Sequence, residues 1–101
     1  MASAYISEYA TVGAPGPSGD IFQCPQEPAL TEQLMTISGS STQSAPFDSR
    51  TRMVRVEVDA ICSLAFGLSP TAVTTAKRFA ANQTEYFGVI GGHKVAVIAN
   101  V

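Results

Sequence analysis

The sequence has few charged residues. Asp, Glu, Lys and Arg make up 14% of its 101 residues, whereas about 25% is usual in globular domains. Only six residues are Lys or Arg, and the formal net charge is −2. Nucleic-acid binding needs a basic face that neutralises phosphates. The composition therefore argues against a nucleic-acid partner, and it predicts a surface that is either covered by Ser, Thr, Gln and Asn or partly buried against something else.

Long apolar runs are also missing. No segment approaches the roughly 20 apolar residues of a transmembrane helix, so no membrane partner is expected. The opening MASAYISEYATVGA has neither the basic nor the apolar region of a secretory signal, which predicts a leaderless protein. In such a protein we expect the two cysteines, Cys24 and Cys62, to be free and buried rather than joined in a disulfide.

Residues for catalysis or metal binding are scarce. The single histidine, His93, has no Cys, His or carboxylate neighbours at ligand spacing. The serines of SGSSTQS lack the strand-to-helix elbow that a nucleophile needs. Glu57 and Asp59 share a strand face about 7 Å apart, and beside Arg55 they resemble a solvated or interface surface. We therefore expect no enzyme and no catalytic, cofactor-binding or metal-binding residue.

Short segments of alternating hydrophobicity fill most of the chain. In RMVRVEVD, Val54, Val56 and Val58 share one face. In AICSLAFG no charge stands on either face, which predicts a strand that is central or covered on both faces. About seven such strands, separated by turn signals, predict an all-β fold, an antiparallel β-sandwich or jelly-roll-like single domain over residues 1–101. The predicted strands are AYISEYA, DIFQC, EQLMTIS, RMVRVEVD, AICSLAFG and the two halves of TEYFGVIGGHKVAVIAN, and the predicted core is Val54, Val56, Val58, Leu64, Phe66, Phe87, Val95 and Val97.

The glycines near the end of the chain predict a turn. Gly91-Gly92 separates two alternating runs, which indicates a β-hairpin with His93 and Lys94 at its tip. A phosphate-binding loop would lead into a helix, whereas a β-branched strand follows here. The sequon Asn82-Gln83-Thr84 is interpreted as an ordinary turn. Residues 69–83 (SPTAVTTAKRFAANQ) have a plausible helix start, but their Thr and Val content favours a loop with at most one helical turn.

The N-terminal segment is irregular. GAPGPSGD contains three Gly and two Pro, which excludes a helix or a central strand, and CPQEP follows it as a further break. Residues 1–28 are either an extended arm that orders on a neighbouring protein or ordinary surface loops. The sequence leaves both alternatives open.

Two stretches, SRTRMVRVEVDAICSLAFGLSPTA and AKRFAANQTEYFGVIGGHKVAVIAN, resemble small virion structural proteins of tailed bacteriophages. The resemblance covers Ser49 to Asn100 and rests on a strand pattern followed by a glycine turn. It implies a head-decoration (cement) subunit on the outer capsid surface of the virion, assembled in the host bacterial cytoplasm. It further implies binding to the major capsid protein and a homo-oligomer, either dimer or trimer, without enzymatic activity or cofactor.

Two other function classes remain. One is a tail- or fibre-associated receptor- or carbohydrate-binding β-sandwich, for which Tyr5, Tyr9 and Tyr86 are the candidate stacking residues. The other is a small enzyme or enzyme inhibitor, for which no group of residues argues.

Overall fold

The computed structural model describes residues 2–15 and 21–100, and within them it contains strands and no helix. The all-β prediction is confirmed. Within this part of the chain no helix could span a bilayer. The strands are β1 (Ser3–Tyr9), β2 (Val12–Pro15), β3 (Ile21–Pro25), β4 (Thr31–Thr36), β5 (Thr42–Gln43), β6 (Met53–Val58), β7 (Cys62–Gly67), β8 (Lys77–Phe79), β9 (Gln83–Gly88) and β10 (Lys94–Ala99).

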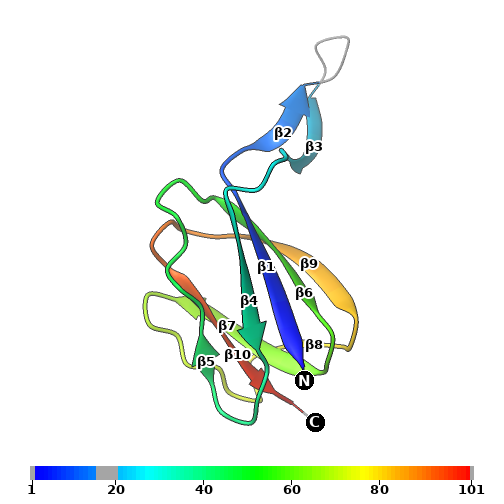
Figure 1. Cartoon of the computed structure of the whole chain (residues 1–101), viewed down its shortest axis with the longest axis vertical. Helices are drawn as coiled ribbons and strands as arrows, with labels where there is room; N and C mark the ends of the chain where they lie inside the picture. Colours follow the sequence, from blue (N-terminus) through cyan, green and yellow to red (C-terminus); the bar gives the residue numbers. More distant parts are fainter. Residues whose placement is uncertain (1, 16–20, 101) are drawn as a thin grey trace.

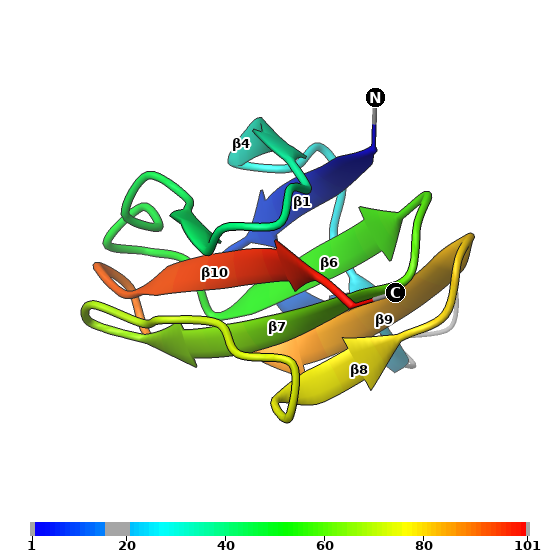
Figure 2. The ribbon, with the colours of Figure 1, turned by 90° about the horizontal axis from the view of Figure 1, so that it is seen from below.

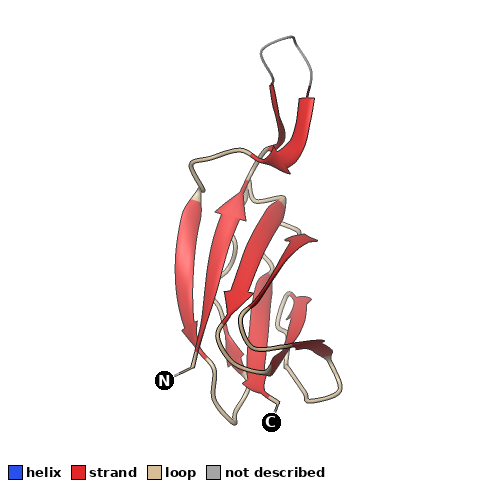
Figure 3. Cartoon of the chain, turned by 90° about the vertical axis from the view of Figure 1, so that its right-hand side faces the viewer, coloured by secondary structure: helices blue, strands red, loops and turns tan. Residues whose placement is uncertain are grey.

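Two antiparallel sheets of four strands face each other as a sandwich (Figure 2). The first sheet has the order β4-β1-β6-β9, and the second has the order β5-β10-β7-β8. Strands β2 and β3 pair only with each other, and this ribbon stands off one end of the sandwich (Figures 1 and 3). The molecule therefore measures 48 Å along its longest axis and 26 and 21 Å along the others.

The core lies between the two sheets and follows the predicted alternation. Six of the eight predicted core side chains have exposed fractions of 0% or 1%. The other two, Phe66 and Phe87, are partly buried against this core, with ring centroids 5.0 Å apart. Alternation succeeds because successive side chains of a strand point to opposite faces. The buried six are Val54, Val56, Val58, Leu64, Val95 and Val97.

The predicted C-terminal hairpin is wrong. Strand β9 pairs with β6 in the first sheet, whereas β10 pairs with β7 and β5 in the second. The chain crosses between the sheets here, and it does so again between β6 and β7. Alternation identifies the buried face of a strand but not its pairing partner, since both strands point their apolar side chains into the same core from opposite sides.

The glycine turn itself is present. His93 N–H donates to Ile90 O at 3.1 Å, and Gly92 has φ +86°. A positive φ at the second central residue alone is the pattern of a type II turn, which splays the flanking strands, whereas tight hairpins use the mirror-image types. Gly91 is needed for another reason, because a Cβ there would lie 2.9 Å from Asp48 O and closer still to the Ser49 carbonyl.

Residues 69–83 form no helix. They contain a single turn, closed by the Ala76 N–H bond to Val73 O, then the short strand β8 and a turn at Asn82 with φ +62°. The loop before β8 covers the outer face of the second sheet. Ser63 on β7 is fully buried there, its hydroxyl 2.7 Å from Asn100 Nδ2. Strand β7 lies between β10 and β8, so the first of the two predicted alternatives, a central strand, is confirmed.

An arm over residues 1–28 does not fit the structure. Strand β1 lies inside the first sheet between β4 and β6, with Ala4 and Ile6 in the core. The alternation of β1 is visible in the sequence. The predicted arm wrongly included this strand because the stretch that follows it is rich in glycine and proline. Among the described residues of this segment, the β2–β3 ribbon is the part that projects from the sandwich, and residues 16–20 lie outside the described residues.

We predict that Gly91→Ala destabilises the protein by about 1–3 kcal/mol, because the added methyl group overpacks against the main chain of residues 48 and 49. Gly39→Ala is the matched control, since a Cβ there meets nothing within 4 Å and surface changes usually stay within about 0.5 kcal/mol. Urea unfolding of both variants measures the difference. Equal effects would contradict the close approach at Gly91.

Candidate functional site

In the described part of the chain, no three His, Cys, Asp or Glu side chains are grouped so that they could hold a metal ion. His93 contributes main-chain bonds at the glycine turn, accepting from Phe47 N–H at 2.8 Å. Its side chain lines a small hollow between the sheets. The expected lack of catalytic, cofactor-binding and metal-binding residues stays a prediction.

A buried carboxylate on β1 forms the main polar cluster. Glu8 has an exposed fraction of 0%. Its Oε1 accepts hydrogen bonds from Asp48 N–H and the Thr51 hydroxyl, each at 2.8 Å, and its Oε2 accepts one from Gln33 Nε2 at 2.8 Å. Three donors compensate for the loss of water around the carboxylate. Glu8 therefore fixes the loop between β5 and β6 against the first sheet.

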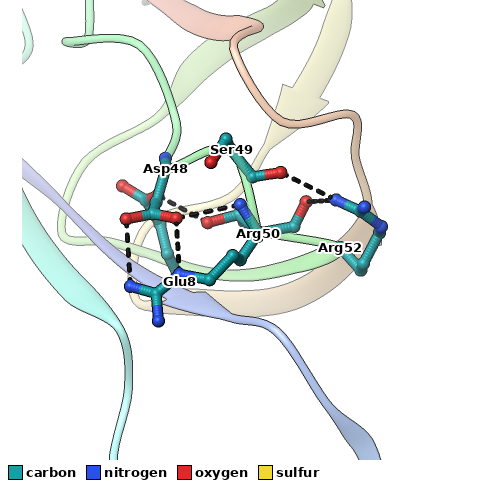
Figure 4. A network of polar contacts seen from close by, with 6 residues as sticks. Glu8, Asp48, Ser49, Arg50 and Arg52 are labelled. Carbon is teal, nitrogen blue, oxygen red and sulfur yellow. Dashed lines mark hydrogen bonds and ion pairs between the residues drawn. The ribbon is translucent and has the colours of Figure 1, made fainter.

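The same loop carries an exposed basic rim (Figure 4). Arg50 contacts the carboxylate of Asp48 at 3.1 Å and lowers the pKa of that carboxyl group. Arg52 Nη1 donates to Ser49 O at 3.1 Å and to Thr51 O at 3.0 Å. The partners of both arginines are residues of the same loop, so these contacts stabilise the loop. We therefore interpret the cluster as structural rather than as an active site.

Sequence reasoning missed Glu8 although a signal was present. Alternation in AYISEYA puts Tyr5, Ser7 and Tyr9 on one face of the strand, and Glu8 therefore falls on the other face with Ala4 and Ile6. A carboxylate on the apolar face of a strand is a sign of burial with hydrogen-bond partners. The partners themselves lie on other elements and cannot be found from β1.

The outer face of the first sheet bears exposed apolar side chains. We call it the tyrosine face and define it by Tyr5, Leu34, Arg55, Glu57 and Tyr86. Their strand register places Tyr5 between Leu34 and Glu57, and Arg55 opposite Tyr86. Tyr5, Leu34 and Tyr86 are 48%, 66% and 50% exposed, and Arg55 lies 3.7 Å from Glu57. This face can offer aromatic contacts around a charged pair.

Tyr9 was predicted as a candidate stacking residue, but its side chain is not exposed for stacking. It is buried, and its hydroxyl donates to Glu27 Oε2 at 2.7 Å. Burial, and then the bond to Glu27, raise the pKa of Tyr9. Of the three candidate stacking residues, Tyr5 and Tyr86 are accessible and Tyr9 instead fixes the segment that leads from the ribbon to β4.

The ribbon begins at a defined hydrogen bond. Gln26 N–H donates to Thr11 O at 3.0 Å, and Val12 pairs with Pro25 above it. A shallow hollow lies at this base. The ribbon continues the antiparallel pairing of β1 with β4 beyond the end of the sandwich. The continuous segment from β1 to β4 therefore forms both the β1–β4 pair and the ribbon.

The two cysteines are free, as predicted, but only one is buried. Cys24 at the end of β3 is exposed, and Cys62 is in the core. Burial, and then the charge of Asp59, raise the pKa of the Cys62 thiol to about 11. Since the thiolate is the reactive form, Cys62 is a packing residue at neutral pH.

Comparison with known proteins gives no relative. No family model, curated protein or solved structure matches the chain.

We predict that Glu8→Leu lowers the free energy of unfolding by about 3–5 kcal/mol, because the donors at Gln33, Asp48 and Thr51 lose their acceptor. Glu8→Gln keeps one oxygen acceptor and should cost about half as much. Glu57→Gln is the control, since an exposed ion pair contributes about 0–1 kcal/mol. Chemical denaturation orders the three variants, and a Glu8→Leu protein as stable as Glu57→Gln would contradict the structural role.

Proposed function

We propose that the protein is a noncatalytic structural subunit of a tailed-bacteriophage virion, a capsid decoration subunit that stabilises the head by binding the major capsid protein. The observation that carries the proposal is the ribbon. Strands β2 and β3 pair only with each other among the described strands, and a two-stranded ribbon by itself is marginally stable in water. Such an element gains stability when a neighbouring protein covers it.

The ribbon also has main-chain groups that can bind a partner protein. Its two outer edges present main-chain N–H and C=O groups that can add to a strand of a partner. A stable contact buries about 1,600 Å² in total, and weak contacts repeated over a shell add through multivalency. The scarce charge fits binding that depends only mildly on salt. The resemblance of residues 49–100 to phage virion proteins supports the choice of a capsid as the partner.

We predict that replacing residues 12–25 by Asn-Gly abolishes decoration while the sandwich stays folded. The replacement joins Thr11 to Gln26, whose existing hydrogen bond is the one that closes a two-residue turn. Both proteins are added to undecorated phage heads, and bound protein and the temperature of DNA release are measured. Circular dichroism and urea unfolding of the variant provide the folding control.

Full-length protein should bind the heads and raise the temperature of DNA release, and the variant should do neither. Full-length protein that does not bind, or that binds without raising this temperature, overturns the decoration function. A variant that binds as well as the full-length protein leaves decoration intact and overturns the role of the ribbon.

A second candidate is a tail-associated receptor- or carbohydrate-binding module, which the exposed tyrosine face favours. Tyr5 and Tyr86 are each about half exposed on one sheet face and flank Arg55 and Glu57. Aromatic rings beside polar groups are a common arrangement in recognition surfaces.

We predict for this candidate that Tyr5→Ala and Tyr86→Ala each weaken binding to a host surface glycan about tenfold or more, as hot-spot aromatics do. Leu68→Ala is the control, because Leu68 is 71% exposed and lies outside the tyrosine face. Glycan-array screening followed by calorimetry is the measurement. No glycan bound by the full-length protein, or equal affinities for all variants, rejects the candidate.

A further inference from the structure

The sandwich has four edge strands, and three of them are protected against pairing. Strands β5 and β8 span two and three residues, and short edges offer few main-chain groups. Strand β9 is longer, but Glu85 points inward from it and is half-buried beside Gln83, to which it is hydrogen-bonded. An inward charge at an edge makes the addition of another strand costly.

Strand β4 lacks these protections. It is six residues long, and its inward side chains are neutral, including Gln33 and the buried Met35. On its outer side, Leu34 is 66% exposed next to Tyr5. The one charge, Glu32, accepts a bond from the Ser7 hydroxyl at 3.2 Å, which directs it toward β1.

The direction of the main-chain groups of β4 follows from its pairing. Ile37 N–H donates to Ala2 O at 3.0 Å. Alternate residues of an antiparallel strand turn these groups to the same side, so the odd-numbered residues of β4 bond to β1. The main-chain groups of Glu32, Leu34 and Thr36 therefore face the free edge.

We propose that β4 pairs with β4 of a second copy of this chain, antiparallel, with Leu34 opposite Leu34 of the second copy. This register is the one that pairs all three open residues, since Glu32 then faces Thr36 of the second copy and Thr36 faces its Glu32. It keeps the two Glu32 carboxylates apart. It also makes the two Leu34 side chains neighbours on the outer face, each flanked by the Tyr5 of its own copy, and cross-strand apolar pairs are stabilising. The result is one eight-stranded sheet across the dimer.

The dimer goes beyond the proposed function and has a consequence for it. Because the two β4 strands run antiparallel, the two ribbons point in opposite directions. In the decoration role, which this step alone assumes, one dimer reaches two capsid subunits. Self-association is measured on the isolated protein, so its failure and the failure of head binding are separate results.

The first test uses proline at an open N–H of each long edge. Leu34→Pro removes the central main-chain N–H donor at the free edge of β4 without breaking a bond to β1. On β9, the Val89 N–H bond to Arg52 O places the even-numbered residues at the free edge. Thr84→Pro therefore removes a free N–H donor from β9 without breaking a bond to β6. Sedimentation velocity should give a dimer for the full-length protein and for Thr84→Pro, and a monomer for Leu34→Pro. A full-length protein that is monomeric at millimolar concentration, or a Leu34→Pro dimer, overturns the proposal.

The second test fixes the register and does not depend on the folding of a proline variant. In a Cys24→Ser background, Leu34→Cys should form an intermolecular disulfide under mild oxidation. The two facing Cα atoms would be about 5.5 Å apart, and disulfides need about 4.4–6.8 Å. Thr36→Cys is the matched control, because its two copies would lie about 13 Å apart along the strands. Equal crosslinking of both variants, or none for Leu34→Cys, overturns this register.

Discussion

The buried carboxylate of Glu8 is the interaction on which one end of the sandwich depends. It accepts hydrogen bonds from Asp48 and Thr51 and so fixes the loop between β5 and β6. That loop in turn exchanges main-chain bonds with the glycine turn, through Phe47 with Gly92 and His93. The turn carries the chain from one sheet to the other. A buried polar group therefore anchors the loop that contacts this turn between the sheets, in addition to the apolar packing that holds the sheets together.

The fold class and the core residues could be predicted from the sequence because both depend on local alternation. Val54, Val56 and Val58 alternate with Arg55 and Glu57, so their buried face is visible without knowledge of any partner. The turn at Gly91-Gly92 was visible for the same local reason. The free state of both cysteines was predicted as well, although the exposure of Cys24 was not.

Pairing and polar partners could not be predicted, because they join distant parts of the chain. Phe87 and Val95 flank one turn, yet their strands belong to opposite sheets, and alternation alone cannot distinguish that from a hairpin. Glu8 lies on a recognisable apolar face, but its donors come from β4 and the β5–β6 loop. The candidate surfaces were predicted in part: Tyr5 and Tyr86 are exposed, whereas Tyr9 is turned to Glu27.

The distribution of open main-chain groups separates the scaffold from the recognition elements. The edge strands β5 and β8 are short, and the edge strand β9 carries the inward-facing Glu85, so these three edges offer little to a neighbouring strand. The β4 edge and the β2–β3 ribbon have unpaired main-chain groups along their edges, and both belong to the continuous segment from β1 to β4 (Figure 1). Four of the five longer sandwich strands other than β4, namely β6, β7, β9 and β10, lie after residue 50, whereas the elements that we propose for binding lie before it. A partner would therefore be recognised by the segment from β1 to β4, which is carried on a sandwich whose other edges are protected.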